Sequence, residues 1–317
     1  DADLVVEAVF EDLGLKQRLF RELDAVARPG AILATNTSGL DIDAIAAVTG
    51  RPQDVVGAHF FSPAQVMRLL EVVQAAATAP DVVATLMGLA TRIGKVGVLA
   101  RVYPGFIGNA MFRCYHRQAH FMVEEGALPH EVDGALTAFG YAMGIFAVHD
   151  LAGNDVGYAT RKAQIATRDP ALRWSDLILT LTEQGRLGQK AGKGWYRYAP
   201  GSRRPERDAA LEAFLVGESA RLGFTRRAIG EEEILERCLY AMVNEGALIL
   251  EEGIAQRAGD IDLVWLNGYG WPAWTGGIMY WADHEGLGKI VSGLEQYGLP
   301  VAPLLRKLAS EGGKFSD

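Results

Sequence analysis

Short apolar runs alternate with segments of helical periodicity through the first hundred residues, and this alternation restricts the folds open to the chain. Continuous apolar runs are typical of strands buried on both faces of a parallel sheet. Five such runs occur, at residues 4–9, 31–35, 55–60, 69–73 and 96–100. Helical periodicity occupies residues 13–27, 38–48 (beginning near Asp41) and 81–93. This order predicts a mostly parallel sheet with helices on its faces.

The first predicted strand begins at the first residues of the sequence, and no glycine-rich turn precedes it. A doubly wound nucleotide-binding fold uses a first βαβ unit that carries the pattern Gly-x-Gly-x-x-Gly. The one formal match, Gly268-Tyr-Gly270-Trp-Pro-Ala273, follows helical sequence, and Trp and Pro crowd its turn. We reject it and expect an N-terminally truncated chain. The expected fold class is α/β: a partial doubly wound, Rossmann-like sheet that lacks its first βαβ unit.

Beyond Pro104 the pattern becomes helical, and several short motifs recur later in the same order. The recurring pairs are Arg113-Cys114 with Arg237-Cys238, Glu124-Glu125-Gly126 with Glu251-Glu252-Gly253, Glu131-Val-Asp133 with Asp260-Ile-Asp262, and Phe139-Gly140 with Tyr269-Gly270. Chance similarity between amphipathic helices is the alternative to a true repeat. Because the order is kept and the insertions are small, we favour duplication, which predicts two all-α domains whose faces pack on each other.

These patterns divide the chain into four regions. Residues 1–103 are expected to form the C-terminal part of a doubly wound sheet domain, and residues 104–198 a helical domain. Residues 227–317 would be the second helical domain, the repeat of the first. The intervening residues 199–226 are expected to be a linker, because their first part is rich in Pro, Gly and Arg.

Composition excludes several kinds of partner and site. A net charge of −8 and a pI near 5.4 leave no basic stripe for nucleic acid. The two cysteines, Cys114 and Cys238, are far apart, which fits a reducing compartment and excludes a disulfide framework or a cysteine-based zinc site. No metal site is expected, and no apolar run reaches the roughly 20 residues of a membrane span. We expect a soluble, intracellular protein of the cytoplasm.

Two ionisable residues stand out in the predicted sheet. His59 ends the strand-like run Val55-Val-Gly-Ala-His59 before a proline-containing turn, and Glu71 interrupts the apolar run Leu69-Leu-Glu-Val-Val73. A buried glutamate needs a partner, and an imidazole is a suitable one. Such a pair can act as a general base near the strand ends, where α/β sheets bind ligands. The alternative is a structural histidine beside an edge-strand glutamate.

Two neutral polar residues flank the same predicted edge. Ser38 follows a strand in Thr35-Asn-Thr-Ser38, and Asn109 lies where the predicted sheet ends and the helices begin. Both could hold a substrate oxygen in a crevice between domains. Taken singly, Ser38 could be a helix N-cap and Asn109 a buried helix amide.

Several motifs in fixed order resemble the L-3-hydroxyacyl-CoA dehydrogenases of fatty-acid β-oxidation, and most of all the dehydrogenase half of the peroxisomal-type bifunctional enzymes. The resemblance covers essentially the whole chain. Its motifs are Asp3-Leu-Val-Val-Glu-Ala-Val-Phe-Glu11, Thr35-Asn-Thr-Ser38, His59-Phe-Phe-Ser-Pro63, Pro104-Gly-Phe-Ile-Gly-Asn109, Gly188-Gln-Lys-Ala-Gly-Lys-Gly-Trp195-Tyr and Gly268-Tyr-Gly-Trp-Pro272.

The resemblance implies a reaction and a role for each candidate residue. His59 would be the general base in the NAD-dependent oxidation of an L-3-hydroxyacyl-CoA to the 3-ketoacyl-CoA, and Glu71 would orient its ring. Ser38 and Asn109 would bind the substrate, with Ser38 also near the cofactor. The remaining cofactor-binding positions would be Glu11, Lys16 and Ser62. Ser62 departs from the Asn of many family members, which weakens the nicotinamide contact carried over there.

The resemblance also carries expectations about the chain as a whole. Residues 1–103 would be the C-terminal part of an NAD-binding domain, and residues 104–198 the helical substrate domain. Without the glycine-rich turn, the chain alone is expected to bind NAD poorly and to have little activity, while the parent protein is the enzyme. We expect a monomer whose two helical domains pack within one chain, and fusion to an enoyl-CoA hydratase domain in the parent is a further expectation. Two alternatives stay open: a hydroxyacid dehydrogenase of the 6-phosphogluconate type, and a non-catalytic scaffold module.

Overall fold

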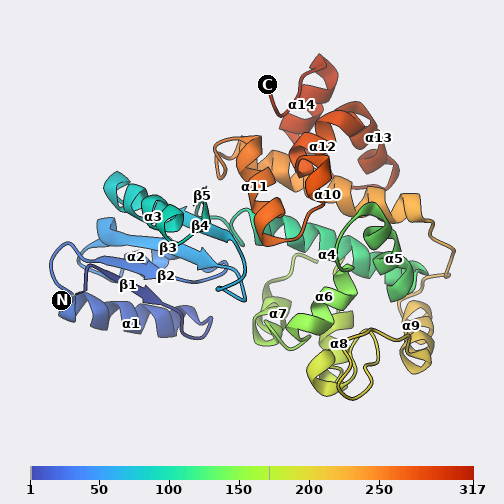
Figure 1. The fold of residues 1–317 in the computed structure, drawn as a ribbon. Coiled ribbons are helices and arrows are strands. Elements are labelled where there is room, and N and C mark those ends of the chain that lie inside the picture. Colours follow the sequence, from blue (N-terminus) through green and yellow to red (C-terminus); the bar gives the residue numbers. More distant parts are fainter. Residues whose placement is uncertain (1, 171) are drawn as a thin grey trace. The chain divides into compact units, whose positions relative to one another are not determined.

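The computed structural model describes residues 2–170 and 172–317, and its N-terminal part is built on a five-stranded sheet (Figure 1). The strands lie in sequence order: β1 (Leu4–Glu7), β2 (Ile32–Thr35), β3 (Val55–Phe60), β4 (Leu69–Gln74) and β5 (Val96–Arg101). The pairs β1–β2, β2–β3 and β4–β5 are parallel, as predicted, but β3 and β4 are antiparallel. The sheet is therefore mixed, and this reversal sets the register of the candidate site.

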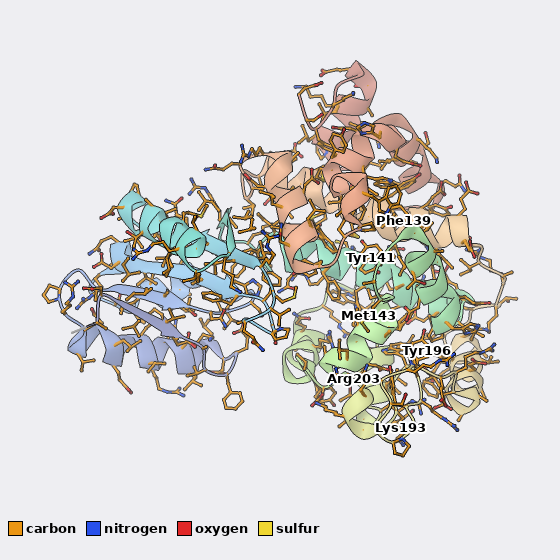
Figure 2. All side chains as sticks on the ribbon, viewed as in Figure 1. Phe139, Tyr141, Met143, Lys193, Tyr196 and Arg203 are labelled. Atoms are coloured by element: carbon orange, nitrogen blue, oxygen red, sulfur yellow. The ribbon has the colours of Figure 1, made fainter. Side chains whose placement is uncertain are left out.

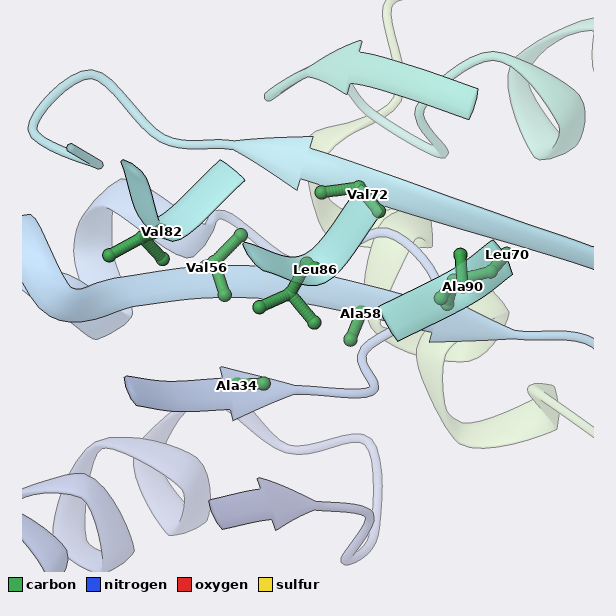
Figure 3. Packing of buried hydrophobic residues seen from close by; sticks show 8 residues of the cluster. All are labelled: Ala34, Val56, Ala58, Leu70, Val72, Val82, Leu86 and Ala90. Carbon is green, nitrogen blue, oxygen red and sulfur yellow. The ribbon is translucent and has the colours of Figure 1, made fainter. Parts of the chain in front are cut away.

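Helices cover both faces of the sheet. Successive strand residues point to opposite faces, so Val56 and Ala58 of β3 face one side and Gly57 faces the other. Val56 and Ala58 pack with Val82, Leu86 and Ala90 of helix α3 (Pro80–Arg92), as Figure 3 shows. The other face carries α2 (Ile42–Ala46), and a Cβ at Gly57 would overlap the side chain of Ile42.

The first two helices begin where aspartate side chains cap them. Asp12 accepts a hydrogen bond from the N–H of Leu15 and starts α1 (Leu13–Val26). Asp41 accepts from the N–H of Ala44 and starts α2, as the sequence predicted. Because Asp41 is the cap, the alternative interpretation of Ser38 as an N-cap does not apply. Both caps satisfy backbone donors that a helix leaves open at its N-terminus.

The chain divides into two compact units that differ from the four predicted regions. Unit 1 comprises residues 1–113 and 242–317, and unit 2 comprises residues 114–241. Helices α4 (Gly108–Glu125) and α10 (Glu231–Glu251) contribute residues to both. Unit 1 also holds α11 (Ala258–Gly268), α12 (Ile278–Glu285), α13 (Leu287–Gln296) and α14 (Pro303–Glu311). Unit 2 holds α5 (Pro129–Phe139), α6 (Ile145–Ala152), α7 (Tyr158–Gln164), α8 (Leu177–Glu183) and α9 (Ala209–Arg221).

The range expected to be a linker, residues 199–226, is more ordered than the sequence suggested. Its second half contains α9, which Asp208 caps through the N–H of Ala210. The Pro/Gly/Arg-rich first half is irregular, and Arg197 and Glu206 exchange backbone hydrogen bonds across it. The predicted domain boundaries themselves stay predictions. Among the helices that the structure describes, none is long and apolar enough to cross a bilayer.

One side-chain arrangement occurs twice and supports the predicted duplication. In unit 2, the carboxylate of Asp133 on α5 accepts from the N–H groups of Phe146 and Ala147 at the start of α6, at 2.9 and 3.0 Å. In unit 1, Asp262 on α11 accepts from the N–H groups at the start of α12, from Met279 at 2.7 Å and Tyr280 at 3.3 Å.

Glycines make room for both of these carboxylates. A Cβ at Gly144 would overlap Asp133, and a Cβ at Gly277 would overlap Asp262. Each glycine directly precedes the helix that the aspartate caps. The helix order, the cap and the adjoining glycine are thus the same in both copies, which chance similarity of amphipathic helices would not produce.

Candidate active site

His59 and Glu71 form a buried pair across the antiparallel strands β3 and β4. They are direct partners in the strand register, so their side chains project from the same face of the sheet. The Nδ1 of His59 lies 2.7 Å from the Oε2 of Glu71. Glu71 is fully buried and His59 is 6% exposed. The predicted contact is therefore present, and it follows from the reversal of β4.

The second oxygen of Glu71 holds the start of helix α4. Its Oε1 accepts from the backbone N–H groups of Ile107 at 3.3 Å and Gly108 at 3.0 Å. A helix N-terminus carries a partial positive charge, which favours an ionised carboxylate there. An ionised carboxylate only accepts hydrogen bonds, so the Nδ1 of His59 must be the donor. The Nε2 of His59 then carries the lone pair that a general base needs.

Aromatic rings surround the imidazole and restrict its motion. The ring of Phe61 lies 4.4 Å from that of His59, and the ring of Phe106 lies 5.9 Å away, measured between centroids. Phe106 is fully buried and has a φ of 51°, a left-handed backbone conformation that a bulky residue rarely adopts. This turn carries the chain from β5 to the N–H groups that Glu71 binds.

Asn109, at the start of α4, is fixed by two hydrogen bonds. Its Nδ2 donates to the backbone oxygen of Ser38 at 3.0 Å, and its Oδ1 accepts from the hydroxyl of Tyr269 at 2.8 Å. Burial, and secondarily the charge of Glu71, raises the pKa of Tyr269 well above its ordinary value. Tyr269 is therefore a permanent donor, and it fixes which end of the amide faces Ser38.

Tyr269 is a site residue that the sequence analysis missed. It follows α11 in the second helical copy, far from Asn109 in the chain, and it packs edge-on against Phe61 at 5.3 Å. A Cβ at Gly108 would overlap its ring, so the absence of a side chain there is a packing requirement. The available signal was the Gly268-Tyr-Gly-Trp-Pro272 motif, which supported the repeat and the family resemblance but gave Tyr269 no role in the site.

Glu11, which follows β1, accepts hydrogen bonds from residues that follow β2. Its Oε1 accepts from the hydroxyl of Thr37 at 2.7 Å and from both the N–H and the hydroxyl of Ser38, at 2.8 and 3.0 Å. Its Oε2 lies 3.6 Å from the ammonium of Lys16. The side chain remains 36% exposed, so this carboxylate still faces solvent while its position is fixed.

Lys16 is buried, which changes how it can serve the site. Its ammonium lies 2.7 Å from the Oε1 of Glu7, whose Oε2 accepts from the hydroxyl of Thr35 at 2.7 Å. Lys16 has no exposed surface. Its ammonium can therefore act through Glu11, in place of the predicted direct contact with a cofactor. Ser62, the last of the predicted positions, follows β3 and is exposed.

Most of these residues meet at one edge of the sheet. Strands β1, β2 and β3 run parallel, so residues 7–11, 35–38 and 59–62 lie at their common carboxyl ends. Ligands of open α/β sheets bind outside these ends. A different cavity, of about 600 Å³, lies in unit 2, and its lining includes Asp133, Met143, Tyr196 and Arg203. Figure 2 labels the last three of these residues. None of the residues that line the cavity belongs to the predicted site.

A Rossmann-like sheet with a His–carboxylate pair at its edge, followed by helices, has the features of an NAD-linked dehydrogenase. Residues 1–102 match the model of the 3-hydroxyacyl-CoA dehydrogenase NAD binding domain, and residues 105–198 match that of the C-terminal domain. The chain belongs to the 3-hydroxyacyl-CoA dehydrogenase family.

Similar proteins agree with this assignment. The peroxisomal bifunctional enzymes of Danio rerio and Homo sapiens are each 46% identical, over 98% of this chain. The 3-hydroxybutyryl-CoA dehydrogenase of Escherichia coli has a similar structure, with a TM-score of 0.82 and 29% identity over 98% of this chain and 82% of that one. The dehydrogenase part of C. elegans multifunctional enzyme 1 has a TM-score of 0.66 and 32% identity, over 96% and 71%. The chain spans about half the length of the curated relatives, 46% in both cases.

Proposed function

We propose that the protein containing this chain oxidises L-3-hydroxyacyl-CoA to 3-ketoacyl-CoA with NAD as the hydride acceptor, in fatty-acid β-oxidation. The observation that carries the proposal is the His59–Glu71 pair at the ligand-binding edge of the sheet, in a chain of the 3-hydroxyacyl-CoA dehydrogenase family. A scaffold module would need neither an imidazole with a free lone pair nor a buried carboxylate to orient it.

In the proposed reaction, His59 takes the proton of the substrate 3-hydroxyl on its Nε2. The C3–H bond breaks as the O–H bond does, and the C–O single bond becomes the carbonyl of the product. NAD, when bound, supplies the acceptor for the hydride that leaves C3. Glu71 stabilises the imidazolium that His59 becomes, because its carboxylate lies 2.7 Å from Nδ1.

The residues around Glu11 fit a cofactor at the same edge. Glu11 presents a carboxylate that is partly exposed and yet held by Thr37, Ser38 and Lys16. A fixed polar group beside the strand ends can position the polar part of a nicotinamide. Lys16 enters this proposal as the residue that positions Glu11, and Ser62 stays a predicted contact.

Ser38 and Asn109 are proposed to hold the substrate oxygens. In the structure, the hydroxyl of Ser38 donates to Glu11, and the Nδ2 of Asn109 donates to the backbone of Ser38. An amide nitrogen has two N–H groups, so Asn109 can keep this bond and donate the second to a substrate. Because both residues belong to one hydrogen-bonded group, losing either should disturb the other.

The test is the exchange His59→Gln in the full-length protein. General-base catalysis contributes roughly 10²–10⁴-fold, so kcat should fall by that factor while KM changes little. NADH formation from an L-3-hydroxyacyl-CoA is the assay. His284→Gln is the matched control, because His284 is exposed on α12. Unchanged activity in a folded His59→Gln protein would overturn the proposal.

We also propose that the two helical copies make this chain a monomer with respect to the interface between them. Within unit 2, Arg237 of α10 donates to Glu125 of α4 at 3.0 Å. Within unit 1, the indole of Trp265 on α11 donates to the sulfur of Met111 on α4 at 3.2 Å. Light scattering checks this, and a tight dimer that dissociates when residues 227–317 are deleted would contradict it. Fusion to an enoyl-CoA hydratase domain stays a prediction.

The cellular compartment stays a prediction as well. The sequence favoured the cytoplasm, whereas the Danio rerio and Homo sapiens relatives carry "peroxisomal" in their names. Imaging of the tagged full-length protein in its own cell decides between these two compartments.

A further inference from the structure

Three histidines of unit 2 form a cluster that the proposed dehydrogenase reaction does not use. His116 and His120 lie one turn apart on α4, and His149 lies near the end of α6. Each offers a ring nitrogen, and the three nitrogens all lie within 4.8 Å of one another. The ring of His116 is 4.0 Å from that of His120 and 4.3 Å from that of His149, between centroids. We call this set the His cluster.

The environment of the His cluster is buried and apolar. His120 is 1% exposed and His149 is 7% exposed. The rings of Phe146 and Trp195 lie 5.7 and 5.0 Å from that of His120. The buried Nε2 of His120 has no hydrogen-bond partner among the residues that the structure describes. A buried polar atom of this kind points to a ligand, because a native interior rarely leaves one unsatisfied.

We propose that the His cluster binds one divalent transition-metal ion, of which Zn²⁺ is the representative, and that the ion fastens α6 to α4. Imidazole nitrogens are ligands for Zn²⁺, Cu²⁺ and Ni²⁺, whereas Mg²⁺ and Ca²⁺ require oxygen ligands, which the His cluster lacks. Three histidines also form a known type of zinc site, with a fourth position left for water. Histidines at i and i+4 lie on the same face of a helix, as a shared ion requires.

Two further observations bear on the fit. Zn–N bonds of about 2.0–2.1 Å in a tetrahedral site place ligand nitrogens roughly 3.4 Å apart, which is compatible with three nitrogens that all lie within 4.8 Å of one another. Burial, as the largest cause, lowers the pKa of all three histidines, so their lone pairs are available near neutral pH. A ligating imidazole must be deprotonated in this way.

The neighbouring charges have defined roles. The positive charge of Arg161 on α7 also lowers the pKa values of the three histidines. The same charge repels a metal ion bound to the His cluster. The carboxylate of Asp150 does not ligate the ion, because it accepts from the N–H groups of Trp195 and Tyr196, both at 2.9 Å. These bonds fix the end of α6 and so the position of His149.

The experiment is a titration of the untagged full chain, freed of metal by a chelator, with Zn²⁺ followed by calorimetry. Co²⁺ is the spectroscopic probe, since its visible absorption reports tetrahedral nitrogen coordination. We expect one ion per chain. His120→Phe keeps an aromatic ring in the buried site and should weaken binding by roughly 100-fold or more. Arg161→Gln should tighten binding by roughly tenfold, because it removes the opposing charge.

His284→Gln is the matched control, since it removes a histidine from the exposed surface of unit 1 and should leave the affinity unchanged. If His120→Phe does not fold, histidine ring NMR of the wild-type chain with and without Zn²⁺ gives the same answer. Absence of stoichiometric binding overturns the proposal, and so does binding that survives His120→Phe or is lost in His284→Gln. None of these readouts depends on dehydrogenase activity, so the two proposals fail separately.

Discussion

Replacing Glu71 with Gln isolates the charge of the buried carboxylate, because the exchange keeps the shape of the side chain. In the wild-type protein, Oε2 accepts from His59, while Oε1 accepts from the N–H groups of Ile107 and Gly108. The new amide has one oxygen and one NH₂ group. The backbone N–H groups of Ile107 and Gly108 need an acceptor, so the amide oxygen stays beside them and the NH₂ group faces His59. It donates to Nδ1, which moves the ring proton to Nε2.

His59 then presents an N–H where the base needs a lone pair. Loss of the correct tautomer in a His–carboxylate pair lowers kcat by on the order of 10⁴-fold, and we expect Glu71→Gln to lose on the order of 10³–10⁴-fold. Only the second N–H of the new amide is left without an acceptor, so the free energy of unfolding should fall by about 1–3 kcal/mol. The variant should therefore be folded and nearly inactive.

Glu71→Ala is the contrasting variant. It leaves three buried donors without an acceptor, and each orphaned group costs about 1–3 kcal/mol. The summed loss of stability is therefore at least about 3 kcal/mol. NADH formation by the full-length protein measures kcat, and urea unfolding measures stability. Near-wild-type kcat in Glu71→Gln, or an Ala variant as stable as the Gln variant, would refute the reasoning.

Three further predictions concern the second helical copy and its counterpart. Tyr269→Phe removes the hydroxyl that orients Asn109, so steady-state kinetics should show kcat lowered by roughly tenfold at a stability cost of about 0.5–1.5 kcal/mol. Burial raises the pKa of Asp262 to about 6, so the folded state holds this proton more tightly than the unfolded state. The stability that this proton contributes is present below pH 3.8, the ordinary pKa, and is lost as the pH rises through about 6. In urea unfolding from pH 4 to 7, the free energy of unfolding of the wild-type protein should fall by up to about 3 kcal/mol from this cause, and Asp262→Asn should lack that fall. Gly144→Ala should cost about 2 kcal/mol or more by overpacking against Asp133, whereas Gly134→Ala, in open space on α5, should be neutral or stabilising in thermal unfolding.

The sheet could be predicted in outline because its strands are apolar runs and its helices have their own period, with aspartate caps at α1 and α2 and a proline at the start of α3. The sequence analysis did not predict the reversal between β3 and β4, although a signal was present. Only residues 61–68 connect these strands, and a parallel crossover needs about a dozen residues or more. Applying that limit would have given the antiparallel pair, and with it a direct cross-strand contact for His59.

The site could be predicted where one rule sufficed and not where the fold brought distant residues together. The rule that a buried glutamate needs a partner found the contact of Glu71 with His59. The same rule applied to Glu7, in the first apolar run, would have indicated that Lys16 is buried beside it. The bond from Tyr269 to Asn109 follows from no such rule, because it joins the two helical copies across 160 residues of the chain.

That bond gives the duplication a role beyond covering an apolar face. Unit 1 joins the two ends of the chain, so Tyr269 of the second copy reaches the start of α4 in the first. The fit is mutual, because Gly108 has no side chain at the point where the ring of Tyr269 packs. The N–H of the same Gly108 donates to Glu71. The second copy therefore contacts the helix end that orients the carboxylate of the proposed base, and loss of this copy should weaken the site itself as well as expose the helices that it covers.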